Sequence, residues 1–422
     1  MAPGNWKSAL RYSAPTSRRS FLRAAAGTAA MASSSAWATP GLPKPAPRRI
    51  LACVGTYSSP QGPEGSRGRG QGIYVLEMNP ASGALTQREV IPNDANPACL
   101  ALAPSRARLF CANEVSNYGG GSSGSVSGYA VDRVTRHLTF INTVSSEGAG
   151  PAHLSVHPSG KYVLVANYAG GSVAVLPIHD SGELGAATAV IHDQGVVGPE
   201  QPHSAPKGSF AISGHDKPHA HMIQADAAGR FVFASDLGLD RIFIWKFDGE
   251  KGTLTPNDPD SVALPPGDGP RHFAFHPSGR WFYSLQEEAS TLVVFDYDAS
   301  RGRLTEKQTL SSLPKGFVGT NYTSEVMISA DGKFLYAANR LHDSIAWFPI
   351  SATGKLVFGG EEWTCGDYPR SFNIDPTGNF LYCCNQRGDA ITTFRVNKNT
   401  GALSFTGQYT PIGTPANIVF LP

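Results

Sequence analysis

Residues 151–167 of the chain read PAHLSVHPSGKYVLVAN, residues 270–286 read PRHFAFHPSGRWFYSLQ, and residues 369–385 read PRSFNIDPTGNFLYCCN. Each stretch alternates apolar and polar residues, reaches a turn rich in Pro, Ser, Asp and Gly, and resumes with β-branched or aromatic residues. This pattern predicts a β-hairpin. Looser copies begin at Pro97, Ala220 and Thr323.

A second turn phrase, of the Thr/Ser-Gly-x-Leu kind, follows each hairpin after a third apolar run such as residues 172–178. Its seven copies begin at Ser82, Thr135, Ser181, Lys251, Arg301, Thr353 and Thr400. A unit of about 50 residues that repeats a hairpin, a third strand and an outer strand indicates a β-propeller. A WD40 propeller is disfavoured because the repeats lack its Gly-His and Trp-Asp dipeptide motifs.

The chain has seven outer turns but only six complete hairpins, so one inner strand is still to be found. Residues 415–420 supply it, and they would complete the sheet formed by residues 50–57, 72–78 and 85–91. We therefore predict an all-β fold: a seven-bladed β-propeller with four antiparallel strands per blade, whose first blade is closed by the C-terminal strand. Such closure removes the free edges of the ring.

The N-terminus carries an export pattern. Arg18 and Arg19 precede a small, apolar stretch over residues 24–36, which ends in an A-x-A-like site at Ala36-Trp37-Ala38. We predict a Tat-type signal peptide over residues 1–38, a linker over 39–49 and a single propeller domain over 50–422. The protein is therefore expected to be exported through the Tat pathway and to work in the periplasm or outside the cell.

The composition excludes several classes of protein. Charges nearly cancel, at +2 over 422 residues, and no basic face is interleaved with aromatic residues, so no nucleic-acid partner is predicted. No apolar run after residue 40 is long enough to span a bilayer, and the mature protein is expected to be a monomer. The six cysteines show neither metal-ligand spacing nor a disulfide framework, and we interpret most of them as core residues, with one or two disulfides left open.

Polar residues gather at one rim of the predicted ring. The residues that open each inner strand and close the second strand must meet there, and several of them are charged or ionisable. From the opening positions come His153, His221, Arg271, His272, Glu325 and Arg370, and from the closing positions come Glu287 and Arg340. Unpaired buried charge is costly, so this convergence favours a functional site at the mouth of the channel. A structural polar ring of strand-ending amides and blade-to-blade ion pairs remains the alternative.

The longest loop between blades, residues 191–217, is predicted to lie at the same face and to act as a lid. It carries His192, Glu200, His203 and His215. Neither H-x-x-x-H nor C-x-x-C spacing occurs, and there is no G-x-S-x-G nucleophile elbow. We therefore predict no metal, no other cofactor and no serine nucleophile.

Several phrases are longer than generic propeller turns. They are PHAH at 218–221, GPRH at 269–272, the run SEV…NR at 324–340, and PRSFNIDPTG at 369–378. Over about residues 50–422 the chain resembles the seven-bladed lactonase family, which includes propeller-type 6-phosphogluconolactonases and carboxy-muconate lactonising enzymes. The resemblance implies metal-independent chemistry on a sugar lactone that carries a carboxylate or phosphate. The matching positions are His153, His221, Arg271, Glu287, Glu325, Arg340 and Arg370.

The hypothesis for function is hydrolysis of a small anionic sugar lactone. A histidine, His153 or His221, would activate water, with Glu287 or Glu325 orienting it. The substrate would be held by Arg271, Arg370, Arg340, His272 and His219. Two alternatives stay open: a non-catalytic propeller that binds a ligand or a protein, and a muconate cycloisomerase-type lyase. Because an exported protein would not meet the 6-phosphogluconolactone of the cytoplasm, the identity of the lactone stays open.

Overall fold

The computed structural model describes residues 50–60, 67–205 and 207–421 of the chain. The predicted signal peptide (residues 1–38) and linker (39–49) lie outside the described residues and stay predictions. Within the described ranges, no helix is long and apolar enough to cross a membrane.

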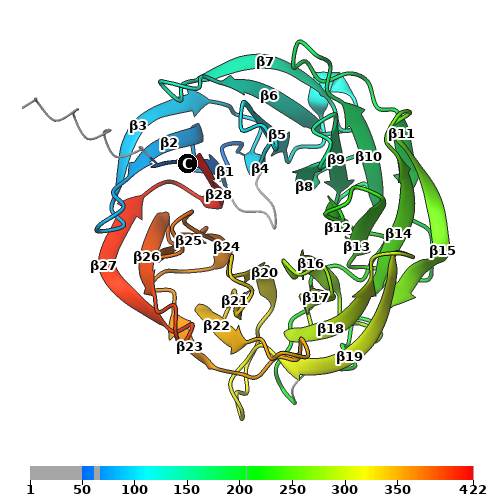
Figure 1. The fold of residues 1–422 in the computed structure, drawn as a ribbon, viewed down its shortest axis with the longest axis vertical. Helices are drawn as coiled ribbons and strands as arrows, with labels where there is room; N and C mark the ends of the chain where they lie inside the picture. The colour runs from blue at the N-terminus through cyan, green and yellow to red at the C-terminus, as the bar shows by residue number, and fades with distance from the viewer. Residues whose placement is uncertain (1–49, 61–66, 206, 422) are drawn as a thin grey trace, which may run out of the picture. The chain divides into compact units, whose positions relative to one another are not determined.

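Seven four-stranded antiparallel sheets are arranged in a ring, with the first strand of each unit innermost (Figure 1). This confirms the predicted seven-bladed propeller. The C-terminal strand β28 (Pro415–Leu421) pairs with β1 (Ile50–Thr56) and so completes the first blade, as predicted. Because the two ends of the described chain share one sheet, the ring closes without a free edge there.

In blades 2 to 7 the strands run outward from the centre in chain order, whereas in blade 1 the order is β28, β1, β2 and β3. Blade 1 adds β2 (Gly72–Met78) and β3 (Leu85–Pro92), and blade 2 has β4 (Pro97–Leu102), β5 (Arg108–Asn113), β6 (Ser125–Val131) and β7 (Leu138–Ser145). Blade 3 has β8 (Pro151–Val156), β9 (Tyr162–Asn167), β10 (Ser172–Pro177) and β11 (Ala189–His192). Blade 4 has β12 (Ala220–Ala225), β13 (Phe231–Asp236), β14 (Arg241–Asp248) and β15 (Thr253–Ala263). Blade 5 has β16 (Pro270–Phe275), β17 (Trp281–Gln286), β18 (Thr291–Asp298) and β19 (Arg303–Ser311). Blade 6 has β20 (Thr323–Ile328), β21 (Phe334–Asn339), β22 (Ser344–Pro349) and β23 (Gly360–Trp363). Blade 7 has β24 (Pro369–Ile374), β25 (Phe380–Asn385), β26 (Ala390–Val396) and β27 (Leu403–Pro411), and a short 3-10 helix, η2, spans Tyr118–Gly120.

The register brings the two predicted columns to one rim. The residue that opens an inner strand pairs with the residue that closes the second strand, as Pro270 does with Gln286 and Pro369 with Asn385. In every blade a β-bulge follows at the second position of the phrase. A bulge breaks the alternation of side chains and re-aims one of them. It is at this position that Arg271 and Arg370 occur.

The core lies between the blades. The fourth position of the phrase is buried, as at Leu154, Phe273 and Phe372, and the sixth position packs against the same clusters. As predicted, most of the cysteines are core residues: all six are free thiols in the structure, and all but Cys365 are buried. The adjacent Cys383 and Cys384 belong to different clusters, because neighbouring residues of a strand point to opposite faces.

The strand-ending amides are structural crosslinks. Asn113 donates from Nδ2 to the hydroxyls of Ser125 and Ser127, at 3.0 and 2.8 Å, and Asn385 donates to the hydroxyl of Thr392 at 2.9 Å. These amides tie the second strand to the third. For Asn113 and Asn385 these contacts support the structural alternative.

Blade 4 departs from this pattern, because its strand-ending residue is Asp236. The charge of Asp236 acts on Asp193, which follows β11 of blade 3, and both carboxyls are buried. Burial and, second to it, the charge of Asp236 together raise the pKa of Asp193 to about 9. Asp193 therefore keeps its proton at neutral pH.

Asp193→Asn is expected to make the free energy of unfolding less dependent on pH. An acid whose pKa is raised on folding, here from an ordinary value of 3.8 to about 9, stabilises the fold fully below its unfolded pKa and loses that contribution as pH rises toward 9. Asparagine cannot ionise, so the variant should lose less stability than the wild type between pH 5 and pH 9 in urea titrations. Asp132→Asn, in an exposed turn, should instead shift stability equally at both pH values. Parallel pH dependences for Asp193→Asn and wild type would contradict the raised pKa of Asp193.

Candidate active site

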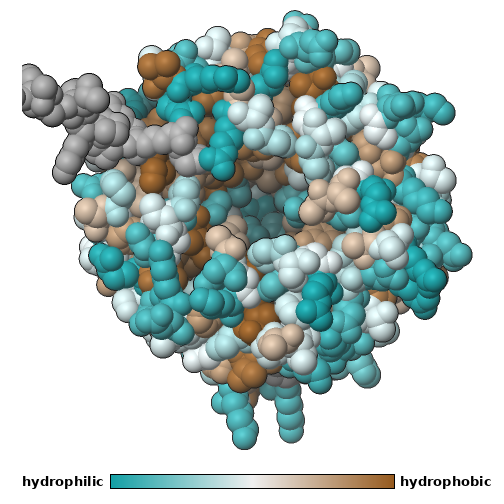
Figure 2. Space-filling view, in the orientation of Figure 1, coloured by the Kyte–Doolittle hydropathy of each residue, from teal (hydrophilic) through white to brown (hydrophobic). Residues whose placement is uncertain are grey.

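Two adjoining cavities lie at the rim where the inner strands begin. The larger has a volume of about 490 Å³ and the smaller about 90 Å³, and both are lined by Ala152, His221, Arg271 and Arg370. Figure 2 shows the ring hollowed at its centre, with hydrophilic residues in the hollow. Eight of the nine predicted site residues line one cavity or both: His153, His221, Arg271, His272, Glu287, Glu325, Arg340 and Arg370.

Glu287 is held between two buried arginines. Its Oε2 lies 2.6 Å from Arg271 Nε, and its Oε1 lies 2.7 Å from Arg340 Nη2. Arg271 also donates from Nη1 to the carbonyl of Ser324, and the Arg340 guanidinium lies 4.2 Å from the centroid of the Tyr322 ring. Burial by itself raises the pKa of Glu287, but Arg340 and Arg271 outweigh it and hold the pKa at about 2. Glu287 therefore stays ionised and fixes two guanidinium groups, and it does not orient a histidine as the sequence suggested.

Arg370 approaches the cavities from blade 7. Its Nη2 lies 3.5 Å from Glu114 Oε2, and the same oxygen accepts a hydrogen bond from the Tyr57 hydroxyl at 2.7 Å. The guanidinium also lies 5.0 Å from the centroid of the Tyr57 ring. Each arginine of the site thus contacts a glutamate, which offsets its charge and holds its orientation.

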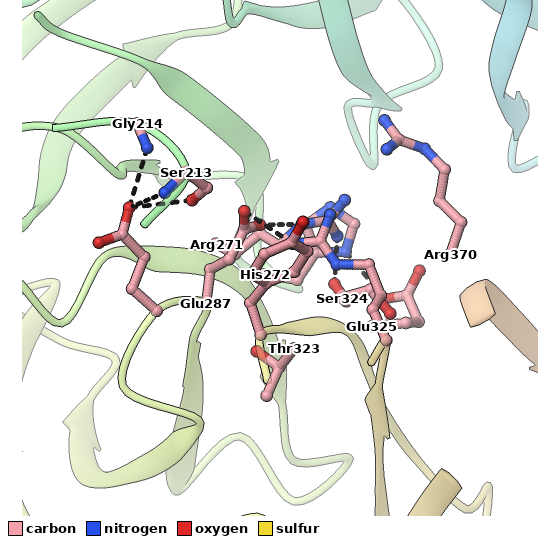
Figure 3. A network of polar contacts seen from close by, with 12 residues as sticks. Ser213, Gly214, Arg271, His272, Glu287, Thr323, Ser324, Glu325 and Arg370 are labelled. Carbon is pink, nitrogen blue, oxygen red and sulfur yellow. Dashed lines mark hydrogen bonds and ion pairs between the residues drawn. The ribbon is translucent and has the colours of Figure 1, made fainter. Parts of the chain in front are cut away.

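Glu325 orients His272 from the neighbouring blade. His272 Nδ1 lies 2.9 Å from Glu325 Oε1, and Glu325 also accepts hydrogen bonds from Ser371 Oγ at 3.1 Å and from the amide of Val326 at 3.1 Å. Figure 3 shows His272 and Glu325 beside Arg271. A histidine held in this way carries its proton on Nδ1 and leaves Nε2 as an acceptor. That Nε2 is buried and has no hydrogen-bond partner among the described residues.

His272 is the middle ring of three. Its centroid lies 5.4 Å from that of His153 and 5.1 Å from that of His221, both in edge-to-face contact. Burial lowers the pKa of all three rings, and the charge of Arg271 lowers each further. At neutral pH the smaller cavity is therefore lined by neutral imidazoles. The glutamate of this cavity contacts His272, and not His153 or His221 as expected from the sequence.

His219 lies apart from the cavities. Its Nδ1 is 3.0 Å from the carbonyl oxygen of Tyr168, its Nε2 is 2.7 Å from Asp216 Oδ1, and its ring stacks on that of Tyr168 at 4.3 Å. His219 therefore supports Tyr168, whose ring lines the larger cavity. The structure gives it no contact with the cavity where it was predicted to bind substrate.

Two lining residues share a position in the repeat with Glu287 and Arg340 but were not among the predicted site residues. Glu114 and Tyr168 each follow a strand-closing residue, and Tyr57 follows β1 in the same way. The shared position was the signal that could have found them. Ser213, from the long loop, also lines the larger cavity, and nothing in the repeat predicts it. Over the ranges that the structure describes, no group of three or more His, Cys, Asp or Glu could hold a metal ion.

Comparisons with known proteins agree with this architecture. The family described as "Lactonase, 7-bladed beta-propeller" matches residues 51–420. A 6-phosphogluconolactonase of Bacillus subtilis is 30% identical over 374 residues, which covers 88% of this chain and 99% of that protein. A solved structure of a Pseudomonas aeruginosa periplasmic gluconolactonase is 30% identical, covers 89% of this chain and 99% of its own, and superposes with a TM-score of 0.78. Identity over nearly the whole ring, rather than over one blade, confirms the resemblance seen in the sequence. This chain belongs to the seven-bladed β-propeller lactonase family.

Proposed function

We propose that this protein hydrolyses the lactone of an anionic sugar acid in the two adjoining cavities. The observation that carries the proposal is the His272 and Glu325 pair. His272 lines the cavity of about 90 Å³ that adjoins the larger one, and its Nε2 has no hydrogen-bond partner among the described residues. The small cavity has room for water molecules, and the larger one for a sugar ring.

The proposed reaction starts with His272 as general base. Nε2 accepts a proton from a water in the smaller cavity, and the water oxygen forms a bond to the lactone carbonyl carbon. Arg271, which lines both cavities, stabilises the oxyanion that develops. The bond between the carbonyl carbon and the ring oxygen then breaks, and the imidazolium returns the proton to the leaving alkoxide. The product is the open hydroxy acid.

Two more residues complete the proposed site. His221 lines both cavities and is proposed to contact the ring oxygen of the lactone, because its buried Nδ1 has no partner among the described residues. Arg370 also lines both cavities and is proposed to bind the anionic group of the substrate.

A panel of aldonolactones and muconolactones tests the proposal, with acid release followed in a pH-stat. We expect turnover of at least one sugar lactone and incorporation of one solvent oxygen per product in H₂¹⁸O. Tight binding without turnover would favour a binding propeller, and ring opening without solvent oxygen would favour a lyase or cycloisomerase. Either result would overturn the proposed hydrolysis.

Arg370→Gln is expected to raise KM about 10-fold or more for a lactone that carries a carboxylate or phosphate, since a hydrogen bond to a charged group contributes about 1.5–3 kcal/mol. KM for a neutral lactone should change much less. Arg395→Gln, on the outer part of the same blade, is the matched control and should leave both values unchanged. Equal losses for charged and neutral lactones would remove Arg370 from the anion site.

Export is proposed from the twin arginine. Replacing both Arg18 and Arg19 with lysine is expected to retain the protein in the cytoplasm, because the Tat machinery reads the arginine pair. Fractionation of expressing cells, with the wild type and a cytoplasmic marker alongside, measures the outcome. Equal export of both forms would contradict a Tat signal.

A further inference from the structure

The loop of residues 194–217, between β11 and β12, is fastened to the ring at several points. The amide of Gly198 donates to the carbonyl of Gly238, that of His203 to the carbonyl of Pro266, and that of Ser204 to Asp268 Oδ1, all at 2.9–3.0 Å. Ser213, near the end of the loop, lines the larger cavity. The predicted lid is therefore a fastened wall of the site.

The strongest fastening comes from the residue next to Glu287. Glu288 Oε1 accepts hydrogen bonds from the Ser213 amide at 2.7 Å, the Ser213 hydroxyl at 3.0 Å and the Gly214 amide at 2.8 Å (Figure 3 shows Ser213 and Gly214). Its Oε2 lies 3.0 Å from His215 Nδ1. Glu287 and Glu288 thus serve different partners: Glu287 fixes the two site arginines, and Glu288 fixes the loop.

His215 joins two carboxylates. Its Nε2 lies 3.1 Å from Asp240 Oδ1, and its side chain is fully buried, as is that of Glu288. Burial lowers the pKa of His215, but the hydrogen bonds and charges of Asp240 and Glu288 outweigh burial and raise the pKa to about 10. Asp240 is held in turn by the amides of Gly267 and Gly269, at 2.6 and 2.9 Å. The buried imidazolium therefore has fixed anionic partners on both sides.

The fastened segment packs directly against the cavity. A β-carbon on Gly214 would lie 2.6 Å from the Tyr168 hydroxyl and 3.0 Å from Leu237 Cδ2. Tyr168 lines the larger cavity, as Ser213 does. Movement of this segment would therefore reach the wall of the larger cavity.

We propose that Glu288 and His215 are positioning residues, which hold Ser213 and Tyr168 as the wall of the lactone site without touching the substrate. Neither residue lines a cavity. This inference rests on the proposed lactone hydrolysis. A displacement of about 1 Å at a site can lower the rate about 100-fold, so a remote anchor of this kind can govern activity.

Glu288→Ala is expected to lower kcat/KM about 10- to 100-fold, mainly through a higher KM, since the wall of the binding cavity is released. Glu288→Gln keeps an acceptor oxygen for the amides of Ser213 and Gly214 and should recover most of the loss. The matched control is Asp268→Ala, which removes another buried anchor of the same loop, at Ser204, away from the cavities. It should lower Tm by a similar amount and leave kcat/KM nearly unchanged.

Equal losses of kcat/KM in Glu288→Ala and Asp268→Ala, or no recovery in Glu288→Gln, would overturn the proposal. Hydrogen exchange at Ser213 and Gly214 provides a readout that does not depend on turnover. These amides should exchange faster in Glu288→Ala and at the wild-type rate in Asp268→Ala, and unchanged exchange in Glu288→Ala would also overturn the proposal. A wild-type protein without lactonase activity would contradict the proposed function, while the exchange result would still decide whether Glu288 holds the wall.

Discussion

His272→Gln is expected to lower kcat for lactone opening about 100- to 10,000-fold, the range that a general base contributes, with a much smaller change in KM. The physical reason is the position of Nε2. His272 lines the smaller cavity, its Nε2 has no partner among the described residues, and its Nδ1 is held by Glu325 at 2.9 Å. Glutamine keeps a polar group at that place but cannot accept and return a proton at neutral pH. Initial rates on the lactone that the wild type turns over fastest measure the effect.

The control for this variant lies on the same hairpin. His276 is at the turn between β16 and β17, at the other end of the inner strand, where its ring nitrogens contact Ser278 and the carbonyl of Gly332. His276→Gln should therefore leave kcat nearly unchanged. Wild-type kcat in His272→Gln would remove this residue as the base and return the role to His221 or His153.

The pH profile carries a related expectation. In the proposed reaction the neutral form of His272 is the base. Burial together with Arg271 lowers the pKa of His272 below the ordinary value of 6.5, against the opposing charge of Glu325. The wild-type kcat should therefore stay constant as pH falls through 6.5 and decline only at lower pH. Glu325→Gln removes the group that raises this pKa, so it should shift any remaining acid limb to still lower pH.

The fold could be predicted because every blade buries the same positions. The apolar fourth position, the turn and the closing residue recur together, and the count of inner against outer strands required the closing strand at residues 415–420. The rim could be predicted for the same reason, since register follows from the hairpin. What repeats along the chain was therefore readable from the sequence.

The pairings within the site could not be predicted, because they depend on distances between blades. Glu325 of blade 6 meets His272 of blade 5, and Arg370 of blade 7 meets Glu114 of blade 2. Bulges re-aim these side chains by amounts that residue type does not specify. The contact of Glu288 with the long loop has no counterpart in the other blades, so the repeat gave no signal for it.

Glu287→Ala is expected to cost about 3–5 kcal/mol in the free energy of unfolding, the usual effect of removing one partner from a buried ion pair. It would leave Arg271 and Arg340, each 2% exposed, without the carboxylate they share. The charge of Arg340 already lowers the pKa of Arg271, second only to burial, and with Glu287 the pKa is about 10. Without Glu287 the two guanidinium groups would repel each other across the site. Urea unfolding measures the loss, and assays at low temperature, where the variant is folded, measure the accompanying fall in kcat.

A double-mutant cycle separates lost attraction from uncovered repulsion. Arg340→Met removes one of the two cations, so combining it with Glu287→Ala leaves a single buried guanidinium instead of two. If repulsion between Arg271 and Arg340 destabilises Glu287→Ala, the double variant should be more stable than the sum of the two single losses predicts, by about 0.5–3 kcal/mol. Catalysis should not return with stability, because Arg271 would still lack the carboxylate that fixes its Nε. Additive losses would mean that Glu287 acts on each arginine independently. A double variant that regained kcat as well would show that the orientation of Arg271 does not depend on Glu287.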